Sequence, residues 1–337
     1  MNRRWLARWS SLLAPLLVLA GALALRVFDP PILVDLRQRI FDQYQAFKPR
    51  PYDPQWHLQH NTPGVAIIDI DEESLARHGQ WPWPRDLLAR LLGQTYQLGA
   101  VAVAFDMVFA EPDRTSLDVV VPRLEVIEQY AALREQFHKL QALDPSLTNN
   151  DRFFADTLKQ LPTVVLGFSF GSRAGDRIPL IKKGIVYAGS HPFSSVPSFL
   201  AATPNLADLE AAAAGIGSFN VEPDNDGVVR RVPIIFALGA AAEHAQLYPS
   251  LPGEVLRVVQ GDDQSLRIKT ADGSGEVFFG GVAGVVQARI GAIDIPTDAR
   301  GQITLWDTGI RPERSIPAWQ ILDGTVKQER IEGRILF

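Results

Sequence analysis

Residues 65–105 read VAIIDIDEESLARHGQWPWPRDLLARLLGQTYQLGAVAVAF, and this stretch decides the fold class. Val65–Ile70 and Val101–Phe105, at its two ends, are apolar runs of the kind expected of strands that are buried on both faces of a sheet. Between them, Arg85–Leu98 places leucines on one helical face, with a proline before it and a glycine after it. A strand, a helix and a second strand within about 40 residues predict a βαβ unit, which is a parallel pair with a right-handed crossover.

Downstream of this unit the pattern predicts first helices and then short strands. Residues 117–160 are mostly helical, and Thr163–Phe168 returns as a third strand. Two further helices are expected, at Pro252–Gln260 and Ala318–Leu322. The expected short β segments are Ile216–Val221, Val228–Leu238, Val277–Phe279, Val285–Ile290, Gln302–Trp306 and the apolar end of the chain at Gly333–Phe337. We therefore predict an α/β fold, with a three-layer mixed sheet, a parallel βαβ start, a helical excursion and a β-rich second half.

The N-terminal region has the pattern of a membrane anchor. Trp9–Leu25 contains no charged residue and would span about 25 Å as a helix, close to the thickness of a bilayer core. Arg3, Arg4 and Arg8 precede it, which by the positive-inside rule places the N-terminus in the cytoplasm. A cleaved signal peptide is the alternative interpretation. Both interpretations export the rest of the chain, so we expect the body in the periplasm, anchored at the inner membrane.

The chain divides into three parts by pattern. Residues 1–28 form the cytoplasmic N-terminus and transmembrane helix, 29–60 a juxtamembrane helix and linker, and 61–337 the extracytoplasmic domain. The juxtamembrane helix carries an apolar stripe at helical spacing, which either packs on the domain or pairs with a second copy in a homodimer. The stripe consists of Leu33, Leu36, Ile40, Tyr44 and Phe47.

Composition excludes several classes of protein. The chain has no cysteine, which excludes a disulfide framework, a thiolate zinc site and a cysteine nucleophile. Its net charge is −5. Because the first 50 residues are basic, the exported body must be more acidic than this total indicates. An acidic body argues against nucleic acid as a partner, because binding to phosphates requires a basic face.

Acidic residues follow the two strands of the βαβ unit. Asp69 and Asp71 close the first strand and Asp106 closes the second, with Glu111 and Asp113 soon after. If the strands are neighbours, these carboxylates converge at the sheet edge where open α/β sheets bind ligands. The sequence therefore predicts a candidate ligand or cation site, with Asp69, Asp71 and Asp106 as possible ligands of Ca²⁺ or Mg²⁺.

Structural roles for the same residues remain open. Asp71 could cap the short helix at Glu72–Arg77. Arg85, at the start of the crossover helix, could form an ion pair with Asp69 or Asp106. In that case the acidic cluster would be a structural ion network rather than a ligand site.

Three further motifs resemble catalytic or calcium-binding sites. Asp69-Ile70-Asp71 is similar to the nucleophile motif of haloacid-dehalogenase-type phosphatases, but the only late acidic pair of the type that they need, Asp262-Asp263, follows a helix. Gly167–Gly171 matches G-x-S-x-G, but the residues after it have the composition of a loop rather than of the required helix. Asp224–Gly227 is half of a calcium loop, and its Asp-Gly pair favours a β-hairpin instead.

Four motifs together resemble one family. They are Val65–Leu75 (VAIIDIDEESL), Gly79–Arg85 (GQWPWPR), Val103–Arg114 (VAFDMVFAEPDR) and Asp224–Pro233 (DNDGVVRRVP). In this order they resemble the type-2 CHASE domain, an extracellular sensor associated with cyclases and histidine kinases. The resemblance implies an anchor helix, this exported domain, and then further transmembrane helices and a cytoplasmic output module. It also implies that the sequence stops before the last segment of the domain, and it names no ligand.

These observations predict a sensory domain with no catalysis of its own. It would pass an unknown extracytoplasmic signal to an output module such as an adenylate or guanylate cyclase or a histidine kinase. The alternatives are an anchored or secreted phosphatase-like hydrolase that uses Asp69 and Asp71, and a structural envelope module without a ligand.

Overall fold

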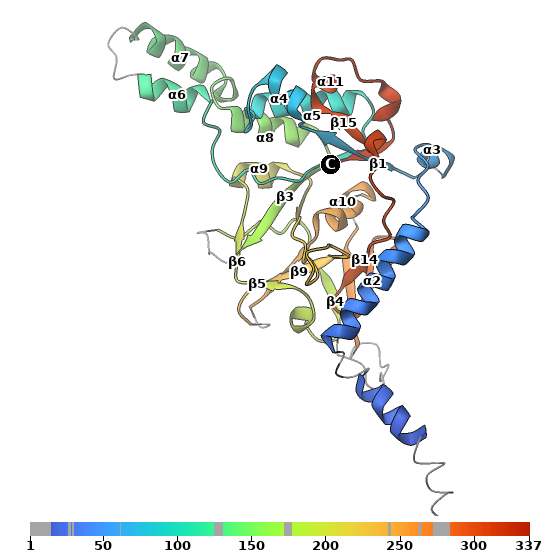
Figure 1. Ribbon diagram of the computed structural model, residues 1–337. Helices are drawn as coiled ribbons and strands as arrows, with labels where there is room; N and C mark the ends of the chain where they lie inside the picture. The colour runs from blue at the N-terminus through green and yellow to red at the C-terminus, as the bar shows by residue number, and fades with distance from the viewer. Residues whose placement is uncertain are drawn as a thin grey trace, which may run out of the picture. The chain divides into compact units, whose positions relative to one another are not determined.

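The computed structural model describes residues 15–25, 28, 30–60, 62–124, 131–171, 177–241, 244–261, 264–271 and 284–337. The chain forms two units, which are described separately below. The first comprises Met1–Tyr52 and Trp306–Ile310, and the second comprises Asp53–Leu305 and Arg311–Phe337. Figure 1 shows their helices and strands.

Residues 15–25 are helical. The helices that follow are α2 (Pro31–Phe47), α3 (Trp56–His60), α4 (Glu72–His78), α5 (Arg85–Gln97), α6 (Leu117–Leu124), α7 (Ala131–Leu143), α8 (Asn150–Gln160), α9 (Ala207–Ala212), α10 (Leu251–Val259) and α11 (Ala318–Leu322). The strands up to residue 238 are β1 (Gly64–Asp69), β2 (Ala102–Phe105), β3 (Val164–Gly171), β4 (Val186–Ala188), β5 (Ser198–Phe199), β6 (Ala201–Thr203), β7 (Gly215–Ser218), β8 (Arg231–Pro233) and β9 (Ile235–Leu238). The later strands are β10 (Gln246–Pro249), β11 (Leu266–Thr270), β12 (Val285–Ile290), β13 (Ile293–Ile295), β14 (Gln302–Thr304), β15 (Ser315–Pro317) and β16 (Arg334–Leu336).

The helical excursion and the bounds of two expected elements are confirmed. The excursion consists of α6, α7 and α8, and the helix expected at Ala318–Leu322 and the strand expected at Val285–Ile290 have those bounds. The strand expected at Val277–Phe279 lies outside the described residues. The class is mixed α/β, with several mixed sheets in place of a single one.

The main sheet has the order β15-β1-β16-β2-β3-β6, and β7 also pairs with β3. The strands β1, β16, β2 and β3 are parallel, and β6 is antiparallel to β3. The prediction that β1 and β2 are direct neighbours is therefore wrong, because β16, from the end of the chain, lies between them. Only a short-range pattern was available to the prediction, whereas the inserted strand comes from the far end of the sequence.

Helices pack on both faces of this sheet. On one face the largest core cluster joins leucines of α5 with Phe154 and Leu158 of α8, Ile321 of α11, and Leu336 of the central strand. On the other face α10 packs on Ala104 and Val165. Figure 1 shows α5 and α8 together above the sheet and α10 below it.

Glycines allow the close approach of α10. A Cβ atom on Gly217 of β7 would lie 2.6 Å from the Cα atom of Leu251, and one on Gly215 would lie 2.7 Å from the side chain of Glu254. A larger residue at either position would push the helix away from the strand, because interiors are close-packed.

The first strand is not buried on both faces as expected. Val65 and Ile67 of β1 are 49% and 48% exposed, while Ala66 between them is buried. The cause is the position of α10, which covers β2, β3 and β7 but does not extend over β1 among the described contacts. By contrast, all four residues of β2 are buried, as predicted.

Smaller sheets make up the β-rich second half of the second unit. They have the orders β10-β9-β5, β13-β12-β11-β4 and β14-β8. The turn at Asp224–Gly227 is present, but β8 pairs with β14 rather than with the strand before the turn, so the hairpin prediction is wrong. Gly167–Gly171 lies inside β3 instead of at a strand-to-helix turn.

The first unit contains α2 and the segment Trp306–Ile310. The backbone N–H of Asp307 donates to Gln45 Oε1 (2.6 Å), and Trp306 Nε1 donates to the carbonyl of Lys48 (3.2 Å). The predicted anchor at Trp9–Leu25 lies partly outside the described residues, because residues 1–14 do. In the part of the chain that the structure describes, no helix has both the length and the apolar character needed to cross a bilayer.

Candidate functional site

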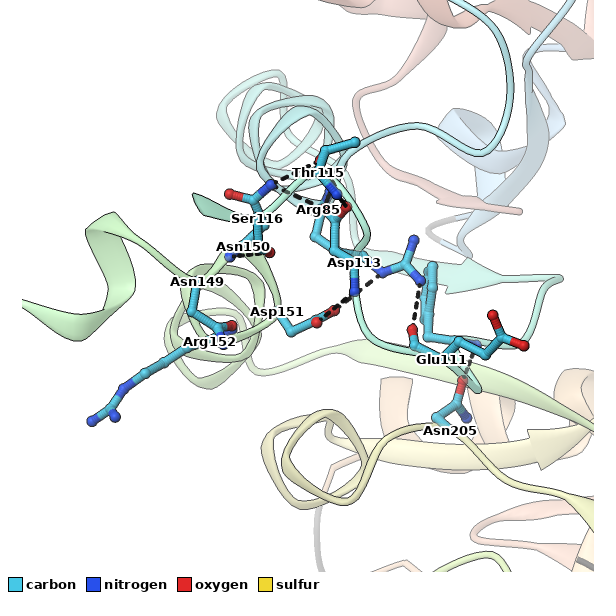
Figure 2. Close-up of polar contacts among 11 residues, drawn as sticks. Arg85, Glu111, Asp113, Thr115, Ser116, Asn149, Asn150, Asp151, Arg152 and Asn205 are labelled. Atoms are coloured by element: carbon cyan, nitrogen blue, oxygen red, sulfur yellow. Dashed lines mark hydrogen bonds and ion pairs between the residues drawn. The ribbon is translucent and has the colours of Figure 1, made fainter. Parts of the chain in front are cut away.

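Asp113 is the centre of a buried polar cluster at the carboxyl edge of the main sheet. It lies in the loop of residues 106–116, between β2 and α6, and is 6% exposed. One carboxylate oxygen accepts from the backbone N–H of Arg85 (2.7 Å) and from Asn150 Nδ2 (3.0 Å). The other accepts from the N–H (2.8 Å) and the hydroxyl (2.7 Å) of Thr115. Figure 2 shows these contacts, in which one carboxylate joins the loop to the first turns of two helices.

Arg85 begins α5 and is also buried. Its Nε lies 3.5 Å from Asp151 Oδ1, its Nη2 is 3.5 Å from the carbonyl of Glu111, and its guanidinium stacks 4.5 Å from the ring centroid of Phe109. The expected ion pair of Arg85 with Asp69 or Asp106 is therefore wrong. Its guanidinium pairs with Asp151, and its backbone N–H donates to Asp113, because the N-terminus of α5 faces the loop and α8 rather than the ends of β1 and β2.

The first turn of α8 completes the cluster. Asp151 Oδ2 accepts from the backbone N–H of Asp113 (2.7 Å), so the two carboxylates are linked through the main chain (Figure 2). The side chain of Asn149 caps the helix by accepting from the N–H of Arg152, and Ser116 Oγ accepts from the N–H of Asn150. Two acidic side chains and one guanidinium thus share a buried volume.

The pKa shifts in this cluster have opposite signs. Burial alone would raise the pKa of Asp113, but the hydrogen bonds from Arg85, Thr115 and Asn150 lower it below its usual value. Burial raises the pKa of Asp151, and the hydrogen bond from Asp113 and the charge of Arg85 only partly offset this. Asp113 is therefore held ionised, while Asp151 is the group that accepts a proton more readily.

Phe109 and Asn205 fix the middle of the same loop. The ring of Phe109 packs edge-on against Phe105 and Phe154, with centroids 5.5 and 5.4 Å away. Its backbone N–H donates to Asn205 Oδ1 (2.8 Å), and Asn205 in turn donates to the carbonyl of Gly167 in β3 (2.9 Å). The loop is therefore tied to the sheet as well as to the helices.

The side chains of the remaining predicted site residues do not join this cluster. Asp71 caps α4, where its Oδ1 accepts from the N–H and hydroxyl of Ser74, so its expected capping role is confirmed. Asp69 accepts from the hydroxyl of Ser315 in β15 (3.0 Å). Glu111 is exposed and forms an ion pair with Arg114.

Asp106 is exposed at the rim of an apolar cavity of about 350 Å³. Partial burial raises its pKa. Within the described residues it has no hydrogen-bond or ion-pair partner, and no three acidic or histidine side chains are grouped as metal ligands would be. Because β16 separates β1 from β2, the carboxylates of Asp69 and Asp106 follow strands that are not neighbours.

Sequence reasoning missed Asp151 and Asn150. The signal available was the run Asn149-Asn150-Asp151 inside the stretch predicted to be mostly helical, because such a run is typical of a capped helix N-terminus. It also missed the buried ion pair of Glu254 and Arg257 on α10, with Nη2 2.6 Å from Oε1.

Comparison with known proteins identifies the family. No curated protein and no solved structure matches the chain. The model of the CHASE2 domain matches residues 14–337, which covers nearly the whole sequence and includes the loop, α5 and β16. The chain therefore belongs to the CHASE2 family, whose members are extracellular sensory domains of signalling receptors.

Proposed function

We propose that the chain is the input domain of a membrane-bound bacterial receptor, with its body in the periplasm and an adenylate or guanylate cyclase or a histidine kinase as its output module. The observation that carries the proposal is the match of the CHASE2 model to residues 14–337. The basic N-terminal flank before the apolar run Trp9–Leu25 supports the orientation. The domain would act through a signal that binds one arrangement of the receptor better than another.

The helix α2 is the element best suited to pass such a change between two copies. Five of its large apolar residues lie on one helical face and are exposed, from 53% at Leu36 to 90% at Phe47, whereas Leu33 of the predicted stripe is half-buried. An exposed apolar stripe at this spacing is typical of a helix that pairs with another helix. The exposed stripe consists of Ile32, Leu36, Ile40, Tyr44 and Phe47. We propose that it pairs with its own copy in a homodimer.

Reporter fusions test the orientation. Alkaline phosphatase folds only outside the cytoplasm, so a fusion after Thr62 should be active and a green fluorescent protein fusion at the same point should be dark. The opposite result would place the domain in the cytoplasm and remove the basis for a periplasmic sensor.

Cysteine cross-linking tests the dimer. The chain has no native cysteine, so a single introduced one gives an unambiguous product. Leu36→Cys and Ile40→Cys should form disulfide-linked dimers in membranes, whereas Asp35→Cys, which is exposed on another face of α2, should form far fewer. Equal cross-linking at all three positions would contradict pairing through the stripe.

A further inference from the structure

A buried histidine lies where the chain enters the second unit. His57 belongs to α3, and in the sequence only residues 48–55 separate this helix from α2. The side chain is 6% exposed, although α3 is a short helix that follows a linker rich in proline. Histidine is the side chain whose ordinary pKa lies closest to neutral pH. The entry segment of the second unit therefore carries a group whose charge changes with small changes in pH.

Two glycines make room for the imidazole ring of His57. A Cβ atom on Gly64, the first residue of β1, would lie 3.0 Å from its Cγ, and one on Gly333 would lie 3.6 Å from its Cδ2. Gly333 has a φ of +70°, and its carbonyl accepts from the N–H of Gly64 (3.1 Å). The ring thus packs on the backbone where β1 and β16 begin, and Figure 1 shows α3 beside β1.

Only one of the two ring nitrogens has a partner among the described residues. The ring forms a hydrogen bond with the backbone of Pro54, which offers a carbonyl and no N–H. Nε2 is buried and has no hydrogen-bond partner in this part of the chain, so the bond to Pro54 uses Nδ1. In the neutral ring Nε2 is therefore the nitrogen with the lone pair. A proton added there would give a buried N–H without an acceptor, which costs free energy.

Two charged groups face the ring of His57. Arg334 of β16 donates from Nη2 to the carbonyl of Pro54 (3.0 Å), the same group that the ring contacts, and Asp53 lies in the linker. Burial lowers the pKa of His57 most, and the charge of Arg334 lowers it further. The bond to Pro54 and the charge of Asp53 offset this only in part, and the two glycines bring no charge.

We infer that His57 is a pH-sensitive switch, which holds α3 on the start of β1 and β16 while its ring is neutral and releases the helix when the ring is protonated. The protonated ring would be a second buried cation beside Arg334. Because residues 48–55 join α3 to α2, release frees the segment through which the chain enters the second unit. The inference deepens the proposed function by making acidification a signal, and it rests on that function only for the exposure of the switch to the periplasm.

The sign of the pH dependence follows from the lowered pKa. A histidine whose pKa is lower in the docked state than in the released state favours docking fully above the ordinary value of 6.5. This contribution declines as the pH falls from 6.5 toward the docked value and is lost below it. Release is therefore expected at mildly acidic pH and not at alkaline pH.

Hydrogen exchange of the full 337-residue chain, measured by mass spectrometry, tests the switch. The N–H of Thr62 donates to the carbonyl of His57 (3.3 Å), so peptides from residues 56–64 report on docking. Their protection, corrected for the intrinsic effect of pH on exchange, should fall several-fold between about pH 7.5 and about pH 5, where histidine titrates. The protection of α5 should stay constant, because the release is local.

Three variants separate His57 from other titrating groups. His57→Asn keeps a donor for Pro54 but cannot be protonated, so its protection should not depend on pH in this range. His60→Asn is the matched control, since His60 is exposed on the same helix and stacks on Trp56 (4.2 Å), and it should behave as the wild type. Arg334→Gln removes the neighbouring cation and should move the midpoint to higher pH, toward 6.5.

Two results would overturn the inference. One is a wild type whose protection at residues 56–64 does not change with pH, and the other is a change of wild-type size in His57→Asn. If that variant does not fold, Arg334→Gln decides, because a midpoint that stays in place shows that another group titrates. These measurements use the purified chain, so they are independent of the reporter fusions. A cytoplasmic domain would remove the periplasmic signal but not the switch itself.

Discussion

Asp106 and Asp113 lie at opposite ends of one loop, yet their environments differ completely. Asp113 is buried and accepts four hydrogen bonds, which lower its pKa. Asp106 is exposed, and its pKa is raised by partial burial that no partner among the described residues offsets. The comparison teaches that hydrogen-bond donors, rather than proximity to a sheet edge, decide which carboxylate is structural.

The difference arises from what surrounds each end of the loop. The Asp113 end meets the first turns of α5 and α8, where the backbone N–H of Arg85 and the side-chain amide of Asn150 donate to it. Helix N-termini also stabilise negative charge. The Asp106 end emerges from β2 at the rim of the apolar cavity, and its surroundings there are largely apolar.

The largest effect is expected for Asp113→Asn. The amide cannot accept all four hydrogen bonds, and the loss of charge leaves Arg85 with Asp151 alone, so we expect a loss of about 3 kcal/mol in the free energy of unfolding. Chemical denaturation of the purified chain measures it. Asp113→Glu keeps the charge but not the hydrogen-bond geometry, so its free energy of unfolding should lie between those of the wild type and Asp113→Asn. A loss below about 0.5 kcal/mol for Asp113→Asn would show that the cluster does not hold the loop.

The pH dependence of that loss follows from the lowered pKa of Asp113. A carboxylate with a lowered folded-state pKa stabilises the fold above its unfolded pKa, near 3.8, and loses this contribution as the pH falls through the folded value. The stability of the wild type and of Asp113→Asn should therefore converge below pH 3.8. Asp151, whose pKa is raised, has the opposite effect on stability, because its ionised form destabilises the fold above that pH. Parallel stability curves down to the acid limit would contradict the role of Asp113.

A smaller effect is expected at Asp71, which represents a third kind of environment. It accepts two hydrogen bonds from Ser74 but is only partly buried. Asp71→Ala should cost about 1 kcal/mol, the usual cost of removing an N-cap, while Asp71→Ser should retain most of the stability. Thermal unfolding followed by circular dichroism measures both. Equal losses for the two variants would assign Asp71 a role other than capping.

Local parts of this picture could be predicted from the sequence, and long-range parts could not. The capping role of Asp71 and the bounds of α5 depend on residues within one turn, so spacing alone was sufficient. The neighbours of β1 depend on β16, which lies at the other end of the chain and carries no signal of where it pairs. The same limit explains why the ion-pair partner of Arg85 was not predicted. Its partner Asp151 arrives through α8, after the whole helical excursion, and no local pattern connects the two.

The smallest effect is expected for Asp106→Asn. The carboxylate is exposed and has no partner among the described residues, so the change in stability should stay within about 0.5 kcal/mol, as for most surface substitutions. Because its pKa is raised, any change should be a slight stabilisation at neutral pH, where the ionised form is the one that burial penalises. Thermal unfolding of both proteins, with and without millimolar Ca²⁺ or Mg²⁺, measures this. If a cation raised the Tm of the wild type but not that of Asp106→Asn, the edge would be a cation site after all, because a ligand that binds only the folded state stabilises it. If Asp106→Asn lost as much stability as Asp113→Asn, the two ends of the loop would not differ as their hydrogen bonds indicate.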